Sequence, residues 1–314
     1  MTFFLNKTKA YFMINFKKIL CPVDFCKCSE NAVRNALIIA ERYHAELHLF
    51  HAILMYEDET YQGKVRTPDF SESYDILSEI SDSKLSELVE SKANDVSITK
   101  KITRGFSAAD EILAYAADNA FDLIVMGTHG RKALGHFLLG SVAEKVVRTA
   151  HCPVLTVHEE SKTIENYEHI FVPVDFSEYS QLALSYGLEI AERYDADMSL
   201  FHVVEQSIHP SFYTSGKSSV FEIDSELRDR SVEAMKEFRK KAGHEDVSTK
   251  YIITEGRAAR EIIEYLENHP VDLIVIATHG LTGIEHFLLG STTEKVIRRA
   301  KVPVLTVKKF EAKT

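Results

Sequence analysis

Short apolar runs alternate with amphipathic segments along the whole chain. The apolar runs are rich in Val, Ile and Leu without polar alternation, which is typical of strands buried on both faces. The pattern predicts strands near residues 17–23, 46–53, 97–103, 122–127, 153–157, 168–174, 197–204, 248–254, 272–277 and 303–307. Helices are predicted near residues 29–43, 71–93, 107–119, 141–150, 178–194, 222–242, 257–268 and 291–300, with Ser29 as the N-cap of the first.

The same series of elements occurs twice. The segments that recur in the second half begin with Ile19, Ala40, Leu49, Asp122, His136 and Pro153, and their counterparts begin with Ile170, Ala191, Leu200, Asp272, His286 and Pro303. This period is far too long for a solenoid, so the chain is predicted to be a duplicated domain. We expect one domain at residues 1–158, with an N-terminal extension at 1–15, and a second at 159–314. Each is expected to be an α/β domain with a doubly wound parallel sheet of five strands.

A glycine motif follows the fourth predicted strand. Gly127, Gly130 and Gly140-Ser141 have the spacing G-x2-G-x9-G-S. A strand end, a glycine turn and a helix start together suit a polyphosphate, because the N–H groups and dipole of a helix N-terminus attract anions. The alternative is structural: a glycine at a strand end is often only a turn, and Ser141 with Glu144 also fits a capping box.

The motif recurs in the second half with one departure. Gly280, Gly290 and Ser291 are retained, but Ala277 stands where the first glycine is expected. An added methyl group there is predicted to crowd a phosphate or change the turn, which gives a weaker second site. Recurrence of the rest favours the ligand interpretation over the structural one.

The first strand supplies the other side of the predicted site. In a doubly wound sheet, ligands bind at the carboxyl ends of the strands where the strand order reverses. The first strand ends in Pro22, Val23 and Asp24, and Ala52 follows the second strand. Asp24 is placed to accept hydrogen bonds from a ribose or an adenine amino group, or, with equal weight, to cap the following helix.

Composition restricts the classes of function. The 314 residues carry a net charge of -10, which argues against a general nucleic-acid or acidic-membrane binder. The cysteines are Cys21, Cys26, Cys28 and Cys152, a distribution that predicts reduced thiols and a cytoplasmic protein. Their spacing is not that of a zinc site, so no metal centre is expected. No run is apolar and long enough for a membrane helix, and no signal peptide is expected.

Catalytic motifs do not stand out. The chain shows neither a Walker A sequence nor a nucleophile elbow. His129, His136, His279 and His286 flank the glycine motifs and are interpreted as loop and packing residues rather than as catalytic or metal-binding groups. We therefore expect a non-enzymatic binding module with at most slow ATP hydrolysis. The alternatives are a nucleotide-dependent enzyme and a non-nucleotide interaction protein with vestigial pockets.

These motifs together resemble the universal stress protein A family in a tandem, two-domain form. The resemblance rests on Pro22-Val23-Asp24-Phe25, the glycine spacing and Cys152–Val157 with their counterparts, and it covers residues 16 to 308. It implies a Rossmann-like fold of the adenine nucleotide alpha hydrolase type, and ATP, with or without Mg²⁺, as the ligand of a stress-response module. The implied nucleotide-binding residues are Pro22, Val23, Asp24, Ala52, Gly127, Gly130, Arg131, Gly140, Ser141, Val142, Pro173, Val174, Asp175, Val203, Gly280, Gly290, Ser291 and Thr292.

The resemblance also implies how the halves associate. Members of the family commonly dimerise through the last strand of the sheet, so this chain is expected to pair its halves as an intramolecular pseudo-dimer. Pairing of whole chains into a homodimer is left open.

Arg131 would reach a phosphate in the first site, whereas its counterpart in the second repeat is Leu281.

Overall fold

The computed structural model describes residues 14–55, 71–90, 96–129, 139–161, 163, 165–205, 219–280 and 289–309. Contacts divide the chain into two compact units, one of residues 15–163 and one made mainly of residues 164–314. Each unit is described by itself. The predicted pairing of the two halves therefore stays a prediction.

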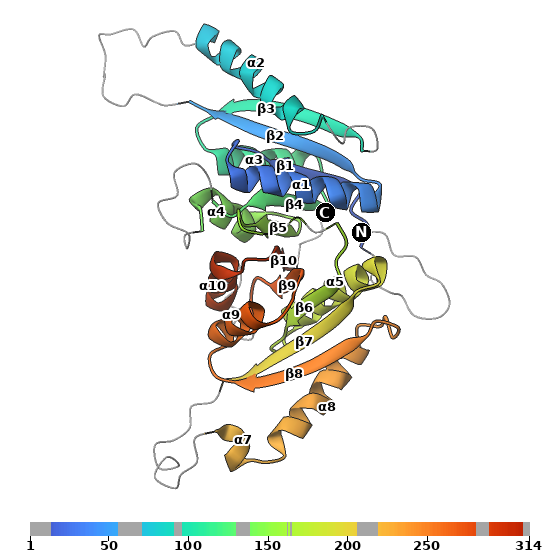
Figure 1. Ribbon diagram of the computed structural model, residues 1–314. Helices are drawn as coiled ribbons and strands as arrows, with labels where there is room; N and C mark the ends of the chain where they lie inside the picture. The colour runs from blue at the N-terminus through green and yellow to red at the C-terminus, as the bar shows by residue number, and fades with distance from the viewer. Residues whose placement is uncertain are drawn as a thin grey trace, which may run out of the picture. The chain divides into compact units, whose positions relative to one another are not determined.

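The first unit is built on a parallel sheet. Among its described residues, five strands follow the order β3-β2-β1-β4-β5, and each neighbouring pair is parallel (Figure 1). The strands are β1 (Lys18–Pro22), β2 (Glu46–Leu54), β3 (Ile98–Gly105), β4 (Leu123–Gly127) and β5 (Val154–Val157). The helices are α1 (Lys27–Tyr43), α2 (Ser71–Glu87), α3 (Ala108–Asp118) and α4 (Ser141–Thr149).

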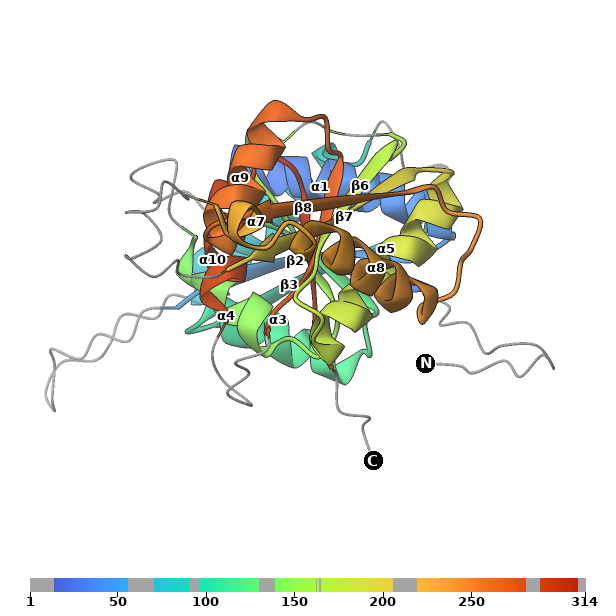
Figure 2. The ribbon, with the colours of Figure 1, turned by 90° about the horizontal axis from the view of Figure 1, so that it is seen from below.

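From β1 to β3 each new strand is added on one side of β1, and the chain then crosses back to add β4 and β5 on the other side. Right-handed crossovers therefore place α1 and α2 on one face of the sheet and α3 and α4 on the other, and Figure 2 shows α1 opposite α3 and α4. The point of reversal lies between β1 and β4, which are neighbours in the sheet. The predicted α/β class and doubly wound parallel arrangement are confirmed.

The second unit repeats this architecture. Its described strands follow the order β10-β9-β6-β7-β8, all parallel, and in Figure 2 α9 and α10 lie on the face opposite α5 and α8. The strands are β6 (His169–Pro173), β7 (Asp197–Val204), β8 (Thr249–Glu255), β9 (Leu273–Ala277) and β10 (Val304–Val307). The helices are α5 (Glu178–Tyr194), α7 (Val220–Ile223), α8 (Leu227–Lys240), α9 (Ala258–Asn268) and α10 (Ser291–Arg299).

The central strands form the cores. Ile19, Leu20 and Cys21 of β1 are fully buried in succession, as are Ile170, Phe171 and Val172 of β6. A strand covered by helices on both faces has no solvent side, so its buried interior positions are apolar. This is why the unbroken apolar runs predicted the strands closely.

Two predictions about helices are wrong. Helix α1 begins at Lys27, and its N-cap is Cys26, whose sulfur accepts a hydrogen bond from the backbone N–H of Ser29. The single helix predicted over 222–242 is two helices. Ser219 and Glu222 form a capping box that starts the short α7, and the extended backbone of Asp224 ends it before α8 begins.

The predicted polar linker near residues 158–167 is partly buried where the structure describes it. His158 and Ser161 are 8% and 5% exposed, and the side chain of Asn31 on α1 donates hydrogen bonds to both of their carbonyl oxygens. The hydroxyl of Thr163 in turn donates to the side-chain oxygen of Asn31. This segment is therefore held against α1.

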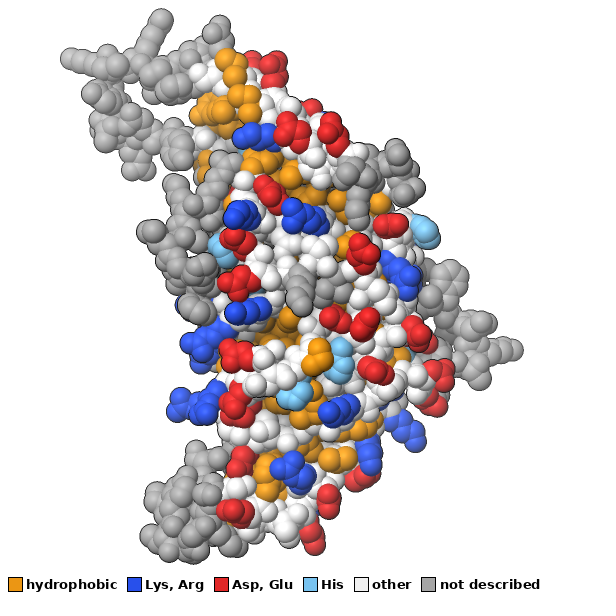
Figure 3. Space-filling model, viewed as in Figure 1, with side chains coloured by type: hydrophobic (Ala, Val, Ile, Leu, Met, Phe, Trp, Pro, Cys, Tyr) orange, Lys and Arg blue, Asp and Glu red, His pale blue; other side chains and the backbone are white. Residues whose placement is uncertain are grey.

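The two units differ on their surfaces. The large hydrophobic side chains exposed among the described residues all belong to the first unit, and Figure 3 shows hydrophobic side chains gathered over α2. They are Leu54, Ile76, Leu77, Ile80 and Phe106. The equivalent helix α8 instead carries charged exposed residues such as Arg230, Glu233 and Glu237. The predicted loops at 55–70 and 205–221 lie almost wholly outside the described residues.

Candidate functional site

The carboxyl ends of β1, β2 and β4 lie at one edge of the first sheet. Ile19 and Leu20 pair with Leu123 and Ile124, and continuing this register brings Val23 level with Gly127. On the other side, Pro22 pairs with Phe50, and the N–H of Val23 donates to the carbonyl of Phe50. The sequence motifs predicted to form a site are thus adjacent in the fold.

Asp24 and Asp175 turn the chain from the first strand of each repeat into a helix. The Oδ1 atom of Asp24 accepts a hydrogen bond from the N–H of Cys26 at 3.1 Å, and Oδ1 of Asp175 accepts one from the N–H of Ser177 at 3.0 Å. The Ser177 hydroxyl also donates to the same oxygen of Asp175. The N-caps of the helices are Cys26 and Ser177, so the predicted capping role of Asp24 is wrong. Each aspartate instead holds the turn before its helix through Oδ1, which leaves its other oxygen with lone pairs for a ligand.

The phenylalanine after each aspartate has a left-handed backbone. Phe25 and Phe176 have φ angles of 63° and 65°, a conformation that is costly for a bulky residue. Their rings lie 4.6 and 4.5 Å from those of His51 and His202, centroid to centroid. Recurrence of the strain at the same corner indicates that both units need this particular turn.

His51 and His202 are not among the predicted site residues. His51 Nδ1 lies 2.7 Å from the carbonyl oxygen of Val23, and His202 Nδ1 lies 2.9 Å from that of Val174. Each histidine thus fixes the end of the first strand from the neighbouring strand. Their recurrence in both repeats, just before Ala52 and Val203, was the available signal.

Ala52 and Val203 lie inside β2 and β7 rather than after them. They pair with Thr103 and Thr254 of the outer strands. Because the β1–β2 register ends at Pro22, Ala52 still extends beyond the end of β1, on the edge where Asp24 lies. Pro22 and Pro173 are the last residues of β1 and β6.

Gly127 is required by helix packing. Its φ angle is not positive, so the backbone conformation does not by itself call for glycine. A Cβ atom added there would meet the Sγ, carbonyl carbon and Cβ of Cys28 at 3.0, 3.1 and 3.2 Å. The space that the glycine opens is therefore occupied by α1.

Gly140 and Gly290 bring a helix start against the strand end. Their N–H groups each donate to a carbonyl oxygen, that of Thr128 or Thr278, at 2.8 Å. A Cβ atom on Gly140 would lie 3.2 Å from the Thr128 oxygen, and one on Gly290 would lie 3.0 Å from the Thr278 oxygen. Glycine thus permits the close approach that places α4 and α10 beside β4 and β9.

The starts of these helices lack a side-chain cap. Gly140 and Gly290 are the N-caps, and neither helix has a side-chain capping hydrogen bond. The proposed capping box of Ser141 with Glu144 is therefore wrong, because Ser141 is the first helical residue. Ser141 and Ser291 are exposed, and Val142 and Thr292 beside them are half-buried. The first-turn N–H groups point toward the end where an anion would bind.

In the second unit the aspartate and the glycine turn touch. A Cβ atom on Gly280 would lie 2.5 Å from Oδ2 of Asp175. Any larger residue at 280 would displace the carboxylate. This contact brings together two predicted site residues, Asp175 and Gly280, that are far apart in the sequence.

The described turn histidines are held by their neighbours. His129 Nδ1 lies 3.1 Å from Oγ1 of Thr128, and His279 Nδ1 lies 3.0 Å from Oγ1 of Thr278. The ring of His279 also contacts that of Tyr179, at 5.7 Å between centroids. These contacts fit the predicted packing role.

The edge of the first site carries a thiol. Burial raises the pKa of Cys26 to about 11, with a further contribution from hydrogen bonding to Asp24. The thiol is therefore protonated at neutral pH and is a poor nucleophile. All four cysteines are free. Gly130, Arg131, His136, Leu281 and His286 lie outside the described residues.

Comparison with known proteins identifies the family. A family model described as the universal stress protein family matches residues 15–158 and again residues 166–308. A universal stress protein of Methanocaldococcus jannaschii is 38% identical over 144 residues, which cover 46% of this chain and 83% of the relative. One from Mycobacterium tuberculosis is 29% identical over 195 residues, which cover 60% of this chain and 63% of the relative.

A solved structure matches both units at once. The crystal structure of a universal stress protein from Archaeoglobus fulgidus aligns with a TM-score of 0.67 at 21% identity, covering 95% of this chain and 99% of the other. At that identity the match supports the fold alone. The two family matches show that the chain belongs to the universal stress protein family and carries two copies of its domain in tandem.

Proposed function

We propose that each unit binds one adenine nucleotide, ATP with or without Mg²⁺, at the carboxyl edge of its sheet, and that occupancy regulates a stress-response module. The observation that carries this proposal is the uncapped start of α4 and α10, held against the strand end by Gly140 and Gly290. An N-terminus with its first N–H groups directed at a sheet edge suits a phosphate chain.

The nucleoside would lie toward β1 and β2, or toward β6 and β7 in the second unit. Asp24 and Asp175 supply carboxylate acceptors for ribose hydroxyls, and the backbone at Ala52 and Val203 faces the same edge. The contact between Asp175 and Gly280 supports a ligand that spans the carboxylate and the turn. Among the described site residues we assign no general base, so we propose a binding module rather than a catalyst. Its free cysteines fit a location in the cytoplasm.

The test is a pair of matched carboxylate-to-amide variants. D24N and D175N keep one side-chain oxygen for the turn but remove the negative charge. A hydrogen bond to a charged group contributes about 1.5–3 kcal/mol, so each variant should weaken ATP at its own site about tenfold or more. Isothermal titration of nucleotide-free protein would measure affinity and stoichiometry.

D122N is the control. Asp122 accepts hydrogen bonds from the N–H groups of Lys17 and Lys18 at the start of β1, at the opposite edge of the sheet. The same charge change there should leave ATP affinity unchanged. If wild-type protein bound no ATP and showed no thermal shift at millimolar ATP with Mg²⁺, the proposal would be wrong and an interaction protein would be favoured.

A further inference from the structure

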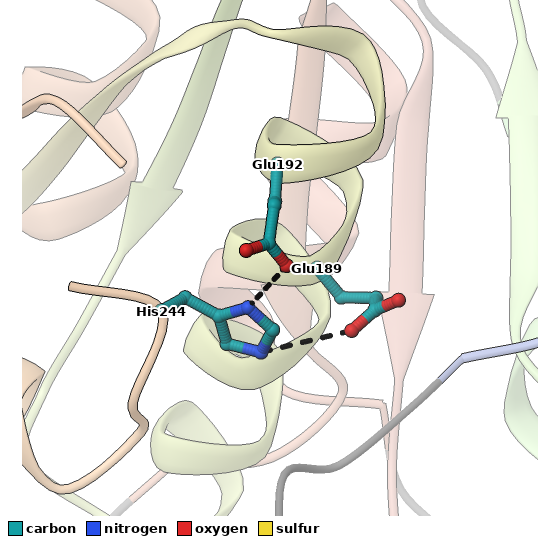
Figure 4. A group of neighbouring side chains, drawn as sticks. All are labelled: Glu189, Glu192 and His244. Atoms are coloured by element: carbon teal, nitrogen blue, oxygen red, sulfur yellow. Dashed lines mark hydrogen bonds and ion pairs between the residues drawn. The ribbon is translucent and has the colours of Figure 1, made fainter. Parts of the chain in front are cut away.

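Three metal-ligating side chains converge in the second unit, away from the proposed nucleotide site. Glu189 and Glu192 project from α5, and His244 lies in the segment between α8 and β8 (Figure 4). One ligand atom from each of the three lies within 4.8 Å of the others. Glu189 is about 16 Å along α5 from the helix N-terminus, which faces the nucleotide edge.

We propose that Glu189, Glu192 and His244 form a binding site for a divalent transition-metal ion, with Zn²⁺ as the best fit. Imidazole and carboxylate together are ligands that zinc accepts. The bound ion would clamp α5 to the segment before β8. With no more than three protein ligands, the ion would keep water in its remaining coordination positions.

The distances fit this chemistry. Nε2 of His244 lies 3.6 Å from Oε2 of Glu189, and two ligands of one tetrahedral zinc ion lie about 3.3–3.5 Å apart. Nδ1 of the same ring lies 2.8 Å from Oε2 of Glu192. A carboxylate on Nδ1–H orients a histidine so that Nε2 faces the metal. Glu192 would therefore orient the ring, while Glu189 and Nε2 of His244 would bind the ion.

The site is buried but has an entrance. The side chains of Glu189 and His244 are only 7% and 5% exposed, whereas that of Glu192 is 53% exposed. Burial raises the pKa of Glu189 above its usual value. A buried carboxylate is costly unless it is paired. The guanidinium of Arg193 approaches its other oxygen, Oε1, at 3.9 Å, which leaves Oε2 directed toward the imidazole.

The backbone around His244 is held in an unusual conformation. Gly243 and His244 have φ angles of 77° and 54°, and the guanidinium of Arg239 donates to both of their carbonyl oxygens. Such strain is retained where the surroundings fix it, and ligand sites are common places for it. The first repeat has Ile38 at the position of Glu189. The fold therefore accepts an apolar side chain at this position, and isoleucine can replace Glu189 in a test.

The experiment uses full-length protein, freed of metal by a chelator and kept reduced. Competition with a chromophoric chelator would measure Zn²⁺ affinity and stoichiometry for wild type, E189I, E192Q, H244N and H151N. E189I restores the residue of the first repeat, and asparagine tolerates the left-handed backbone at 244. H151N removes an exposed histidine of the other unit.

We expect one tight zinc site per wild-type chain, lost in E189I and H244N and retained in H151N. E192Q should weaken it about 10–100-fold, the usual cost of losing an orienting carboxylate. Equal zinc binding by all variants would overturn the proposal and point to the thiols. Absence of tight binding by wild type would also overturn it and leave a plain ion-pair cluster.

A second measurement needs only wild-type protein, so it tests the proposal even if one of the variants does not fold. Co²⁺ bound to wild-type protein should give a visible spectrum of nitrogen and oxygen ligands without a thiolate charge-transfer band. A thiolate band would overturn the assignment, because none of the three side chains contains sulfur.

Discussion

Replacing Gly127 with alanine tests whether the first glycine of the motif serves the ligand or the fold. The new Cβ would lie 3.0–3.2 Å from three atoms of Cys28, where carbon contacts normally lie about 3.5–4.0 Å apart. Overpacking of this kind costs about 1–3 kcal/mol of unfolding free energy. We therefore expect G127A to lower the urea midpoint of the first unit while the protein that remains folded binds ATP normally.

The reciprocal variant A277G should likewise change stability rather than ATP affinity. Ala277 is 6% exposed. Removing its methyl group would cost about 0.8 kcal/mol of burial, and glycine in a strand costs about 0.5–1 kcal/mol more. We expect A277G to be destabilised by about 1–2 kcal/mol with no gain in ATP affinity at the second site.

Urea unfolding and ATP titration of both variants would decide the question. C28A/G127A should recover part of the lost stability, because it removes Sγ but leaves the helix backbone in contact. The packing explanation would be refuted if G127A lost ATP at an unchanged urea midpoint. It would also be refuted if A277G strengthened the second site, as the sequence-based prediction of a crowded phosphate requires.

Two further predictions concern stability. G187A should destabilise the second unit by about 1–3 kcal/mol, because the new Cβ would lie 2.6 Å from Cγ2 of Val172. The first repeat has Ala36 and Cys21 at the positions of Gly187 and Val172, so V172C/G187A should restore the urea midpoint. A midpoint that stayed low in the double variant would contradict this contact. Burial lowers the pKa of His48 in the folded protein below its ordinary value. As the pH falls, the histidine of the unfolded chain therefore binds a proton before that of the folded chain does, and the free energy of unfolding decreases. H48Q should reduce the loss of urea midpoint between about pH 7.5 and about pH 5.5, and an unchanged slope would contradict the assignment.

Much of the fold could be predicted because it follows local rules. Strands such as β1 and β6 are buried on both faces, so their apolar runs mark them directly. Helix boundaries were predicted less well where a single residue determines at which position a helix begins or ends. Cys26, which is not a usual N-cap, starts α1 two residues before the predicted start. The extended backbone of Asp224 ends α7 and divides a segment whose hydrophobic pattern suggested one helix.

The site could be located from the sequence but its residues could not all be given roles. The glycine spacing and the aspartate of each repeat identified the edge of the sheet. The roles of Gly127, His51 and Phe25 depend on contacts with α1, β1 and β2, which are distant in the sequence. Recurrence shows that such residues matter, but not whether they meet a helix or a ligand.

The sequence by itself determined the duplication, the α/β class and the family, because these are properties of periodicity and motif spacing. Only the tertiary structure showed that Gly140 and Gly290 close the strand end onto a helix start. Only it brought Glu189 and Glu192 to His244, more than 50 residues away. The physical reason is that side-chain environments depend on packing between elements, and the spacing of residues along a chain does not specify that packing.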